Sequence, residues 1–193
     1  MGGVVRIVRA TAVLIVVGGI AASVSYAALP LTGRVLHSGE LAGMTISGPD
    51  RVTTGASAWV TNEGLPRSAQ KAEIARLRKL GFVAGVDESL SSDQGRGGIS
   101  VVEQFRSAKS AKAELAYEST SNGPWTYFPV QVIPGARGFE QISNSGNGRN
   151  VAFSDGVYYY AVGAGWSGGS TKAVSRSAVV AAALVLYHRV HGK

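Results

Sequence analysis

Residues 150–160, with the sequence NVAFSDGVYYY, contain two apolar runs joined by Asp155-Gly156. An Asp-Gly pair between apolar runs is the strongest short-range signal of a β-hairpin, because the tight turn favours residues that accept a positive φ. We therefore predict strands over residues 150–154 and 157–162. Successive side chains of a strand point to opposite faces, so Tyr159 is expected to face away from Tyr158 and Tyr160.

Further elements are predicted on both sides of this hairpin from apolar periodicity and turn residues. Ser68 and Ser107 stand where serine caps helix N-termini, and Gly81 stands where glycine ends a helix. The predicted helices cover residues 68–80, 108–118 and 171–190, and the further strands cover 82–90, 99–105, 130–133 and 138–142. This order, with its short loops, predicts an α+β fold with a mainly antiparallel sheet and helices packed on one face.

Upstream of the first predicted helix, glycine and proline interrupt the chain every few residues. Only short strands, at residues 41–46 and 57–61, fit between these interruptions. We interpret residues 34–66 as a Gly/Pro-rich tether and residues 67–193 as the α+β domain.

The N-terminus carries Arg6 and Arg9, followed by residues 10–33 without a charged side chain. One interpretation is a signal peptide cleaved near Ala27, where small residues occupy the cleavage positions. The other is a transmembrane anchor, since a helix of this length at ~1.5 Å per residue exceeds the ~30 Å hydrocarbon core. In either case residues 1–33 form an N-terminal hydrophobic helix that engages the membrane. The arginines keep that end cytoplasmic, so the remainder is extracytoplasmic, anchored or secreted.

Composition excludes several classes of protein. The chain has 193 residues, no cysteine, 45% hydrophobic residues and 16% charged residues. It is too apolar for intrinsic disorder. Because it has no cysteine, it has no disulfide scaffold, no zinc–cysteine site and no cysteine nucleophile. The net charge of +7 is spread along the sequence. It predicts weak attraction to lipid head groups or an anionic wall polymer, and no nucleic-acid binding.

Cofactor and metal motifs are weak. Residues 163–168, GAGWSG, fit the G-x-G-x-x-G pattern, but the chain ends too soon for the second strand and ribose-binding acid of a dinucleotide site. His188 and His191 share a helical spacing, without a nearby carboxylate to complete a metal site. We therefore expect no cofactor and no metal.

Catalytic motifs are equally weak. No G-x-S-x-G nucleophile elbow occurs in the sequence. A pair of carboxylates could cleave glycosidic bonds, and the candidates are Asp87, Glu88, Glu103 and Glu140. Nothing local selects a pair among them, so a cell-wall hydrolase stays the alternative hypothesis and catalytic residues are not assigned.

Aromatic residues suggest binding instead. Trp125, Tyr127, Tyr159 and Trp166 cluster around the predicted sheet and its loops. Tyrosine and tryptophan combine a large apolar surface with a polar group, which suits recognition of a ligand or partner. With export and without a catalytic constellation, the sequence predicts a non-enzymatic envelope domain that binds a protein, a lipid or a wall polymer.

Four segments carry a resemblance to known sequences. They are residues 80–82 (LGF), 102–107 (VEQFRS), 133–139 (IPGARGF) and 151–159 (VAFSDGVYY). Together they resemble a group of exported or membrane-anchored actinobacterial proteins with no assigned activity. The resemblance spans about residues 68–190 and implies export and a compact α+β fold.

Overall fold

The computed structural model describes residues 29–48, 51–62, 65–121, 125–142, 147–166 and 173–192. The predicted signal peptide or anchor falls almost entirely on residues 1–28, so it lies outside the described residues. Within the described ranges, no helix is both long enough and apolar enough to cross a bilayer.

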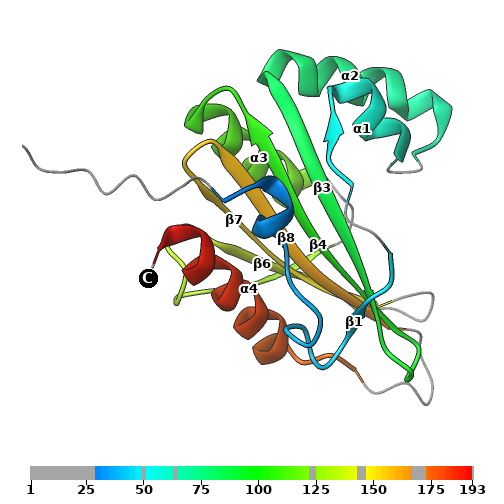
Figure 1. The fold of residues 1–193 in the computed structure, drawn as a ribbon, viewed down its shortest axis with the longest axis vertical. Helices are drawn as coiled ribbons and strands as arrows, with labels where there is room; N and C mark the ends of the chain where they lie inside the picture. The colour runs from blue at the N-terminus through cyan, green and yellow to red at the C-terminus, as the bar shows by residue number, and fades with distance from the viewer. Residues whose placement is uncertain are drawn as a thin grey trace, which may run out of the picture.

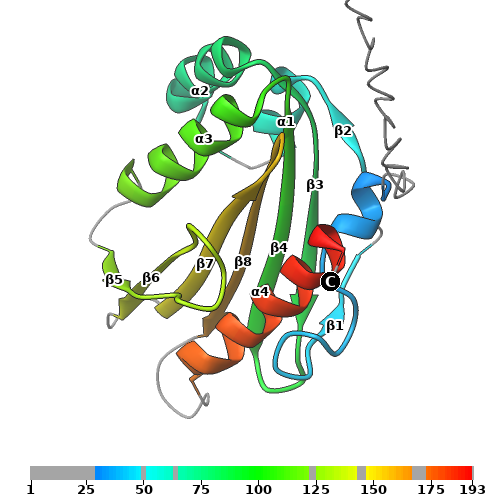
Figure 2. The same ribbon diagram turned by 90° about the vertical axis from the view of Figure 1, so that its left-hand side faces the viewer.

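An eight-stranded sheet forms the centre of the molecule (Figures 1 and 2), and all its pairings are antiparallel. Its order is β1-β3-β4-β8-β7-β6-β5, with β2 also paired to β3. The strands are β1 (Thr45–Ile46), β2 (Thr53–Thr54), β3 (Phe82–Ser91), β4 (Arg96–Phe105), β5 (Thr126–Phe128), β6 (Arg137–Ile142), β7 (Asn147–Asp155) and β8 (Tyr158–Trp166). The predicted α+β class and the mainly antiparallel sheet are confirmed.

Helices cover both faces of this sheet, so the prediction that they pack on one face is wrong. On one face, called the α4 face, lie α4 (Arg176–His191) and the 3-10 helix η1 (Leu31–Arg34). On the other, called the α2–α3 face, lie α1 (Ala56–Asn62), α2 (Arg67–Leu80) and α3 (Ala108–Ser121). The physical reason is that the central strands are apolar on both sides, and both sides therefore need cover.

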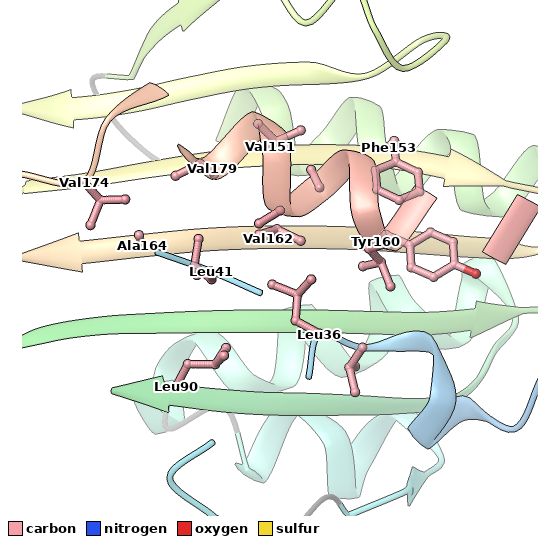
Figure 3. Packing of buried hydrophobic residues seen from close by; sticks show 14 of the residues in the cluster. Leu36, Leu41, Leu90, Val151, Phe153, Tyr160, Val162, Ala164, Val174 and Val179 are labelled. Atoms are coloured by element: carbon pink, nitrogen blue, oxygen red, sulfur yellow. The ribbon is translucent and has the colours of Figure 1, made fainter. Parts of the chain in front are cut away.

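The adjacent residues Tyr159 and Tyr160 show this two-sided packing. Tyr160 packs on the α4 face, where its ring stacks on Phe153 with centroids 4.8 Å apart (Figure 3). Tyr159 belongs to the apolar cluster of the α2–α3 face. The predicted opposition of the two side chains is confirmed.

Residues 29–48 belong to the core of the α4 face, so the expected tether is wrong for this part of the chain. Leu36, Leu41 and Met44 are fully buried, and the Leu36 amide donates to Ser100 Oγ at 3.0 Å. The Arg34 guanidinium donates to the Tyr160 hydroxyl at 2.8 Å. Glycine and proline interrupt regular structure here without preventing the side chains between them from packing.

The predicted strand at residues 57–61 is also wrong, because α1 occupies it. Ala56, Trp59 and Val60 are buried at helical spacing, and they pack on the sheet beside β3. Residues 130–133, another predicted strand, form a turn instead, and the strand lies earlier as β5.

Local signals were more reliable. Gly81 ends α2 with φ 74°, and Ser107 Oγ accepts from the amide of Ser110 at the start of α3. The hairpin of β7 and β8 is present, but its turn is shifted by one residue. Asp155 pairs with Tyr158, so Gly156 (φ 56°) and Val157 form the turn.

Candidate functional site

A cavity of about 580 Å³ lies on the α2–α3 face, between these two helices and strands β4 and β8. This volume is within the range of small-molecule sites, about 300–1,000 Å³. Twelve described residues line it: Leu65, Ala69, Ala72, Glu73, Arg76, Val101, Glu103, Glu114, Tyr117, Glu118, Tyr159 and Ala161.

The periodicities of helix and strand bring these residues together. Residues 69, 72, 73 and 76 of α2 recur at intervals of three and four, as do 114, 117 and 118 of α3, so each set lies on one side of its helix. Residues 101 and 103 of β4, and 159 and 161 of β8, alternate along their strands and form the floor. The site is therefore built on regular elements rather than on loops.

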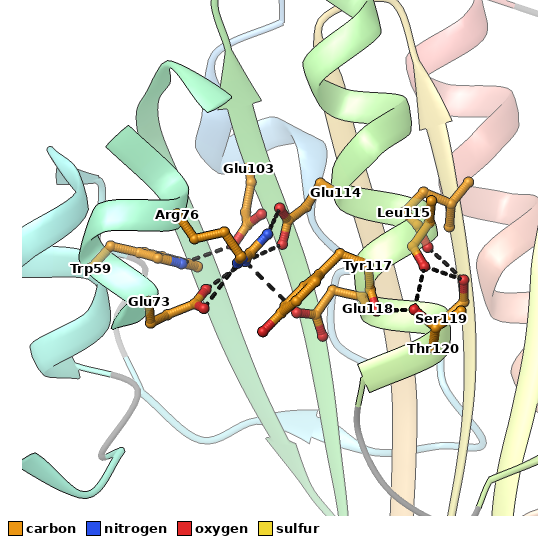
Figure 4. Close-up of polar contacts among 11 residues, drawn as sticks. Trp59, Glu73, Arg76, Glu103, Glu114, Leu115, Tyr117, Glu118, Ser119 and Thr120 are labelled. Carbon is orange, nitrogen blue, oxygen red and sulfur yellow. Dashed lines mark hydrogen bonds and ion pairs between the residues drawn. The ribbon is translucent and has the colours of Figure 1, made fainter. Parts of the chain in front are cut away.

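Arg76 stands at the centre of a polar network that joins α2 to α3 (Figure 4). Its guanidinium donates to both carboxylate oxygens of Glu114, at 2.5 and 2.8 Å, and also to Glu73. Glu118 lies 3.9 Å from the same guanidinium. The ring of Tyr117 is stacked against Arg76, with 3.8 Å from the guanidinium carbon to the ring centroid.

Glu103 forms the floor of the cavity on β4 and is 5% exposed. The indole nitrogen of Trp59 donates to its carboxylate at 2.8 Å. Trp59 can lie over the sheet because Gly85 is opposite Glu103 on β3, and a Cβ at Gly85 would come within 2.7 Å of the indole ring. This glycine therefore lets α1 contribute a hydrogen bond to the cavity floor.

Tyr159 lines the cavity from β8 and is also 5% exposed. Burial raises the pKa of its phenol, and the charges of Glu118, Glu103 and Glu114 raise that pKa further. Within the described part of the chain, no hydrogen bond to its hydroxyl is found. The phenol therefore stays neutral and offers a proton to the cavity.

The cavity is acidic, although the chain as a whole is basic. Four of the 12 acidic residues of the sequence line it, and Arg76 is the one cation among its described lining residues. Burial raises the pKa of Glu114 although Arg76 opposes the shift, whereas hydrogen bonds to Glu73 and Glu114 outweigh burial and raise the pKa of Arg76. Arg76 thus stays charged, and the carboxylates exceed it in number.

The four aromatic residues singled out from the sequence do not form one surface. Tyr159 lies in the cavity, and Trp125 packs edge-on against Phe139 at the margin of the same face. Tyr127 is 54% exposed and donates to the carbonyl of Ser119. Trp166 is buried in the core of the α4 face, on the opposite side of the sheet.

The candidate carboxylates are separated in the same way. Glu103 lies on the α2–α3 face, whereas Glu140 is bound by Arg149 and Arg176 beside α4. A hydrolase pair of these two residues is therefore wrong, because the sheet stands between them. Asp87 is exposed on β3. Its neighbour Glu88 is buried, and its side chain points to the face of the sheet opposite to that of Asp87, because successive side chains of a strand alternate.

The glycine-rich motif has a structural role as far as it is described. Residues 163–166 lie within β8, paired with both β4 and β7, and do not form the phosphate-binding turn of a dinucleotide site. The Asn150 side chain covers Gly163. His191 pairs with Asp155 at 3.3 Å, and the described residues contain no cluster of three metal-ligating side chains.

Sequence reasoning missed Glu73, Arg76, Glu114, Tyr117 and Glu118. The signal available was local: a carboxylate three residues before an arginine on α2, and carboxylates four residues apart on α3. Nothing in the sequence showed that these two helix faces meet over β4 and β8.

Comparison with known protein families finds no match, and comparison with curated proteins finds none. Among solved structures, the extracellular domain of PknH from Mycobacterium tuberculosis is similar, with a TM-score of 0.44 and 15% identity. The similarity covers 76% of this chain and 80% of that one. At this level of similarity it supports no inference about ligand or location.

Proposed function

We propose that this chain is an extracytoplasmic, non-enzymatic binding domain whose ligand occupies the cavity between α2 and α3. The observation that carries the proposal is a ligand-sized cavity with apolar walls and convergent polar groups. Sites for small ligands have this composition: mostly apolar lining, with a few polar groups that fix orientation.

The arrangement of the polar groups favours binding over catalysis. Arg76 holds Glu73 and Glu114, and Trp59 holds Glu103, so these carboxylates are fixed by donors. A general acid or base acts best when its pKa lies near the working pH and its proton is free to move. Carboxylates held as hydrogen-bond acceptors are better suited to orienting a ligand.

The location outside the cytoplasm is supported by the N-terminal sequence. Two arginines followed by the uncharged residues 10–33 are typical of export. An exported domain without cysteine depends on its core for stability, and the two apolar clusters supply one on each face of the sheet.

Blocking the cavity tests the proposal. Ala72 is exposed and lines the cavity, so Ala72→Trp would fill it without disturbing the core. Ala75 is exposed on the same helix outside the cavity, and Ala75→Trp is therefore the matched control. The full-length chain would be screened by thermal shift against amines, polyols, sugars and short fatty acids, with calorimetry on any hit. We expect saturable binding that Ala72→Trp abolishes and Ala75→Trp keeps. Binding that persists in Ala72→Trp, or no saturable ligand at all, would contradict the proposal.

A further inference from the structure

The charge of the cavity lining bears on the class of ligand. Glu73, Glu103, Glu114 and Glu118 face one resident cation, Arg76, in a partly buried space. Charges at such positions interact more strongly than in water, because the effective dielectric constant falls from ~80 to about 20. An anionic ligand would be repelled here, and a cation would offset the excess of carboxylate charge.

A second observation points to a donor and acceptor at the floor. Tyr159 is more than nine-tenths buried, lines the cavity, and has a hydroxyl for which the described residues provide no hydrogen-bond partner. The phenol oxygen can accept a hydrogen bond from a ligand N–H group.

The remaining lining describes the rest of the ligand. Leu65, Ala69, Ala72, Val101 and Ala161 give the cavity apolar walls beside the carboxylates. A methylene chain gains free energy from contact with such walls, because its apolar surface is removed from water. The face of the Tyr117 ring is already stacked against Arg76, so the new cation is expected beside other polar residues of the lining, Glu118, Glu103 and Tyr159.

From these observations we infer that the cavity binds the ammonium group of an alkylamine. The ammonium would donate to the carboxylates of Glu118 and Glu103 and to the Tyr159 hydroxyl, and its alkyl chain would lie along the alanine and valine walls. Arg76 keeps α2 and α3 together and stays in place. This inference rests on the proposed function, because it names the ligand class for the same cavity.

Four five-carbon probes test the inference by calorimetry on the full-length chain. Cadaverine carries two positive charges, pentylamine carries one, 1,5-pentanediol is neutral, and glutarate is a dianion. We expect the two amines to bind at least tenfold more tightly than pentanediol or glutarate, and we expect amine affinity to fall with added salt. Equal affinity for pentanediol and pentylamine would overturn the inference.

Two variants locate the interaction. Glu118→Gln removes one carboxylate charge from a side chain that is 26% exposed, and should weaken pentylamine binding about tenfold, since a hydrogen bond to a charged group is worth ~1.5–3 kcal/mol. Tyr159→Phe should weaken it roughly fivefold, through loss of a neutral acceptor. Glu40→Gln, outside the cavity, should leave it unchanged. Unchanged amine affinity in both cavity variants would overturn the inference.

The outcome also separates this inference from the proposed function. If a neutral probe binds and Ala72→Trp abolishes that binding, the cavity is a binding site but its ligand is not an amine. If the amines bind equally well to Ala72→Trp and to the wild type, both the site and the ligand class are wrong.

Discussion

Two charge clusters lie on opposite faces of the same sheet, and their composition is reversed. On the α4 face, one carboxylate, Glu140, is bound by two cations, Arg149 and Arg176. On the α2–α3 face, one cation, Arg76, stands among Glu73, Glu114 and Glu118. The first cluster ties the start of α4 to the sheet and lies beside a packed core. The second lines a cavity.

The difference contrasts a cluster that stabilises the fold with a cluster that we propose binds a ligand. Hydrogen bonds from Arg176 and Arg149 lower the pKa of Glu140 to about 2, so this carboxylate is ionised and satisfied at neutral pH. Burial raises the pKa of Glu114 in spite of its bond to Arg76. Two cations surround one acid at Glu140, whereas the acids outnumber the cation at Arg76.

The largest expected effect is that of Arg76→Gln. Three carboxylates would lose their shared cation in a partly buried site, which should lower the free energy of unfolding by about 3 kcal/mol at neutral pH. Arg76 lowers the pKa of Glu114 against the effect of burial, so its removal raises that pKa further above the unfolded value. The loss should therefore shrink as the pH falls. Chemical denaturation of the variant at pH 7 and pH 5 measures this, and an equal loss at both values would contradict it.

Glu140→Gln is expected to have the next largest effect, about 2 kcal/mol of stability, because Arg149 and Arg176 lose their common partner and Arg176 is half exposed. The folded pKa of Glu140 is depressed, so its contribution is present above about pH 4.5 and is lost as the pH falls toward 2. Acid titration of stability should be shallower in the variant than in the wild type. Parallel titration curves would argue against this role.

Glu114→Gln should change stability by less than about 1 kcal/mol, since Arg76 keeps Glu73 and Glu118 as partners. The folded pKa of Glu114 is raised, so its contribution favours folding at low pH and is lost as the pH rises through the folded pKa. Denaturation measured upward from the ordinary pKa of 4.5 should show a weaker decline of stability with pH in the variant. A loss as large as that of Glu140→Gln would remove the distinction between the two clusters.

Glu40→Gln gives the smallest expected effect and calibrates the others. Glu40 pairs with Arg189 at a partly exposed position between the N-terminal segment and α4. Pairs of this kind contribute about 0.2–1 kcal/mol. The loss of unfolding free energy in the variant, measured by thermal denaturation, should stay within this range. A larger loss would show that the pair stabilises the fold more than an exposed ion pair does.

The fold was predictable where the determinants were local. Gly81 and Ser107 end and begin helices through their own backbone and side-chain chemistry, and residues 150–160 formed the expected hairpin. The placement of helices was not predictable in this way. Tyr159 and Tyr160 indicated two faces, but which face each helix covers depends on contacts across the whole chain.

The candidate site was less predictable than the fold. Of its lining residues, sequence analysis had singled out Tyr159 and Glu103, each for a different function. Arg76 and Glu114 are 38 positions apart, and their hydrogen bonds exist because α2 and α3 pack side by side on the sheet. Trp166, predicted to bind, is buried on the other face because it lies an even number of residues from Tyr160 on β8, and both side chains therefore point to the α4 face.

The sequence by itself determined the helices α2, α3 and α4, the hairpin and the alternation of Tyr158, Tyr159 and Tyr160, because these follow from backbone geometry and from the preferences of neighbouring residues. It also carried the N-terminal pattern that predicts export. The tertiary structure alone decided that residues 29–48 pack into the core and that carboxylates from α2, α3 and β4 meet around Arg76. Both outcomes depend on which distant surfaces bury one another, and hydrophobic burial is non-directional, so no local pattern specifies it.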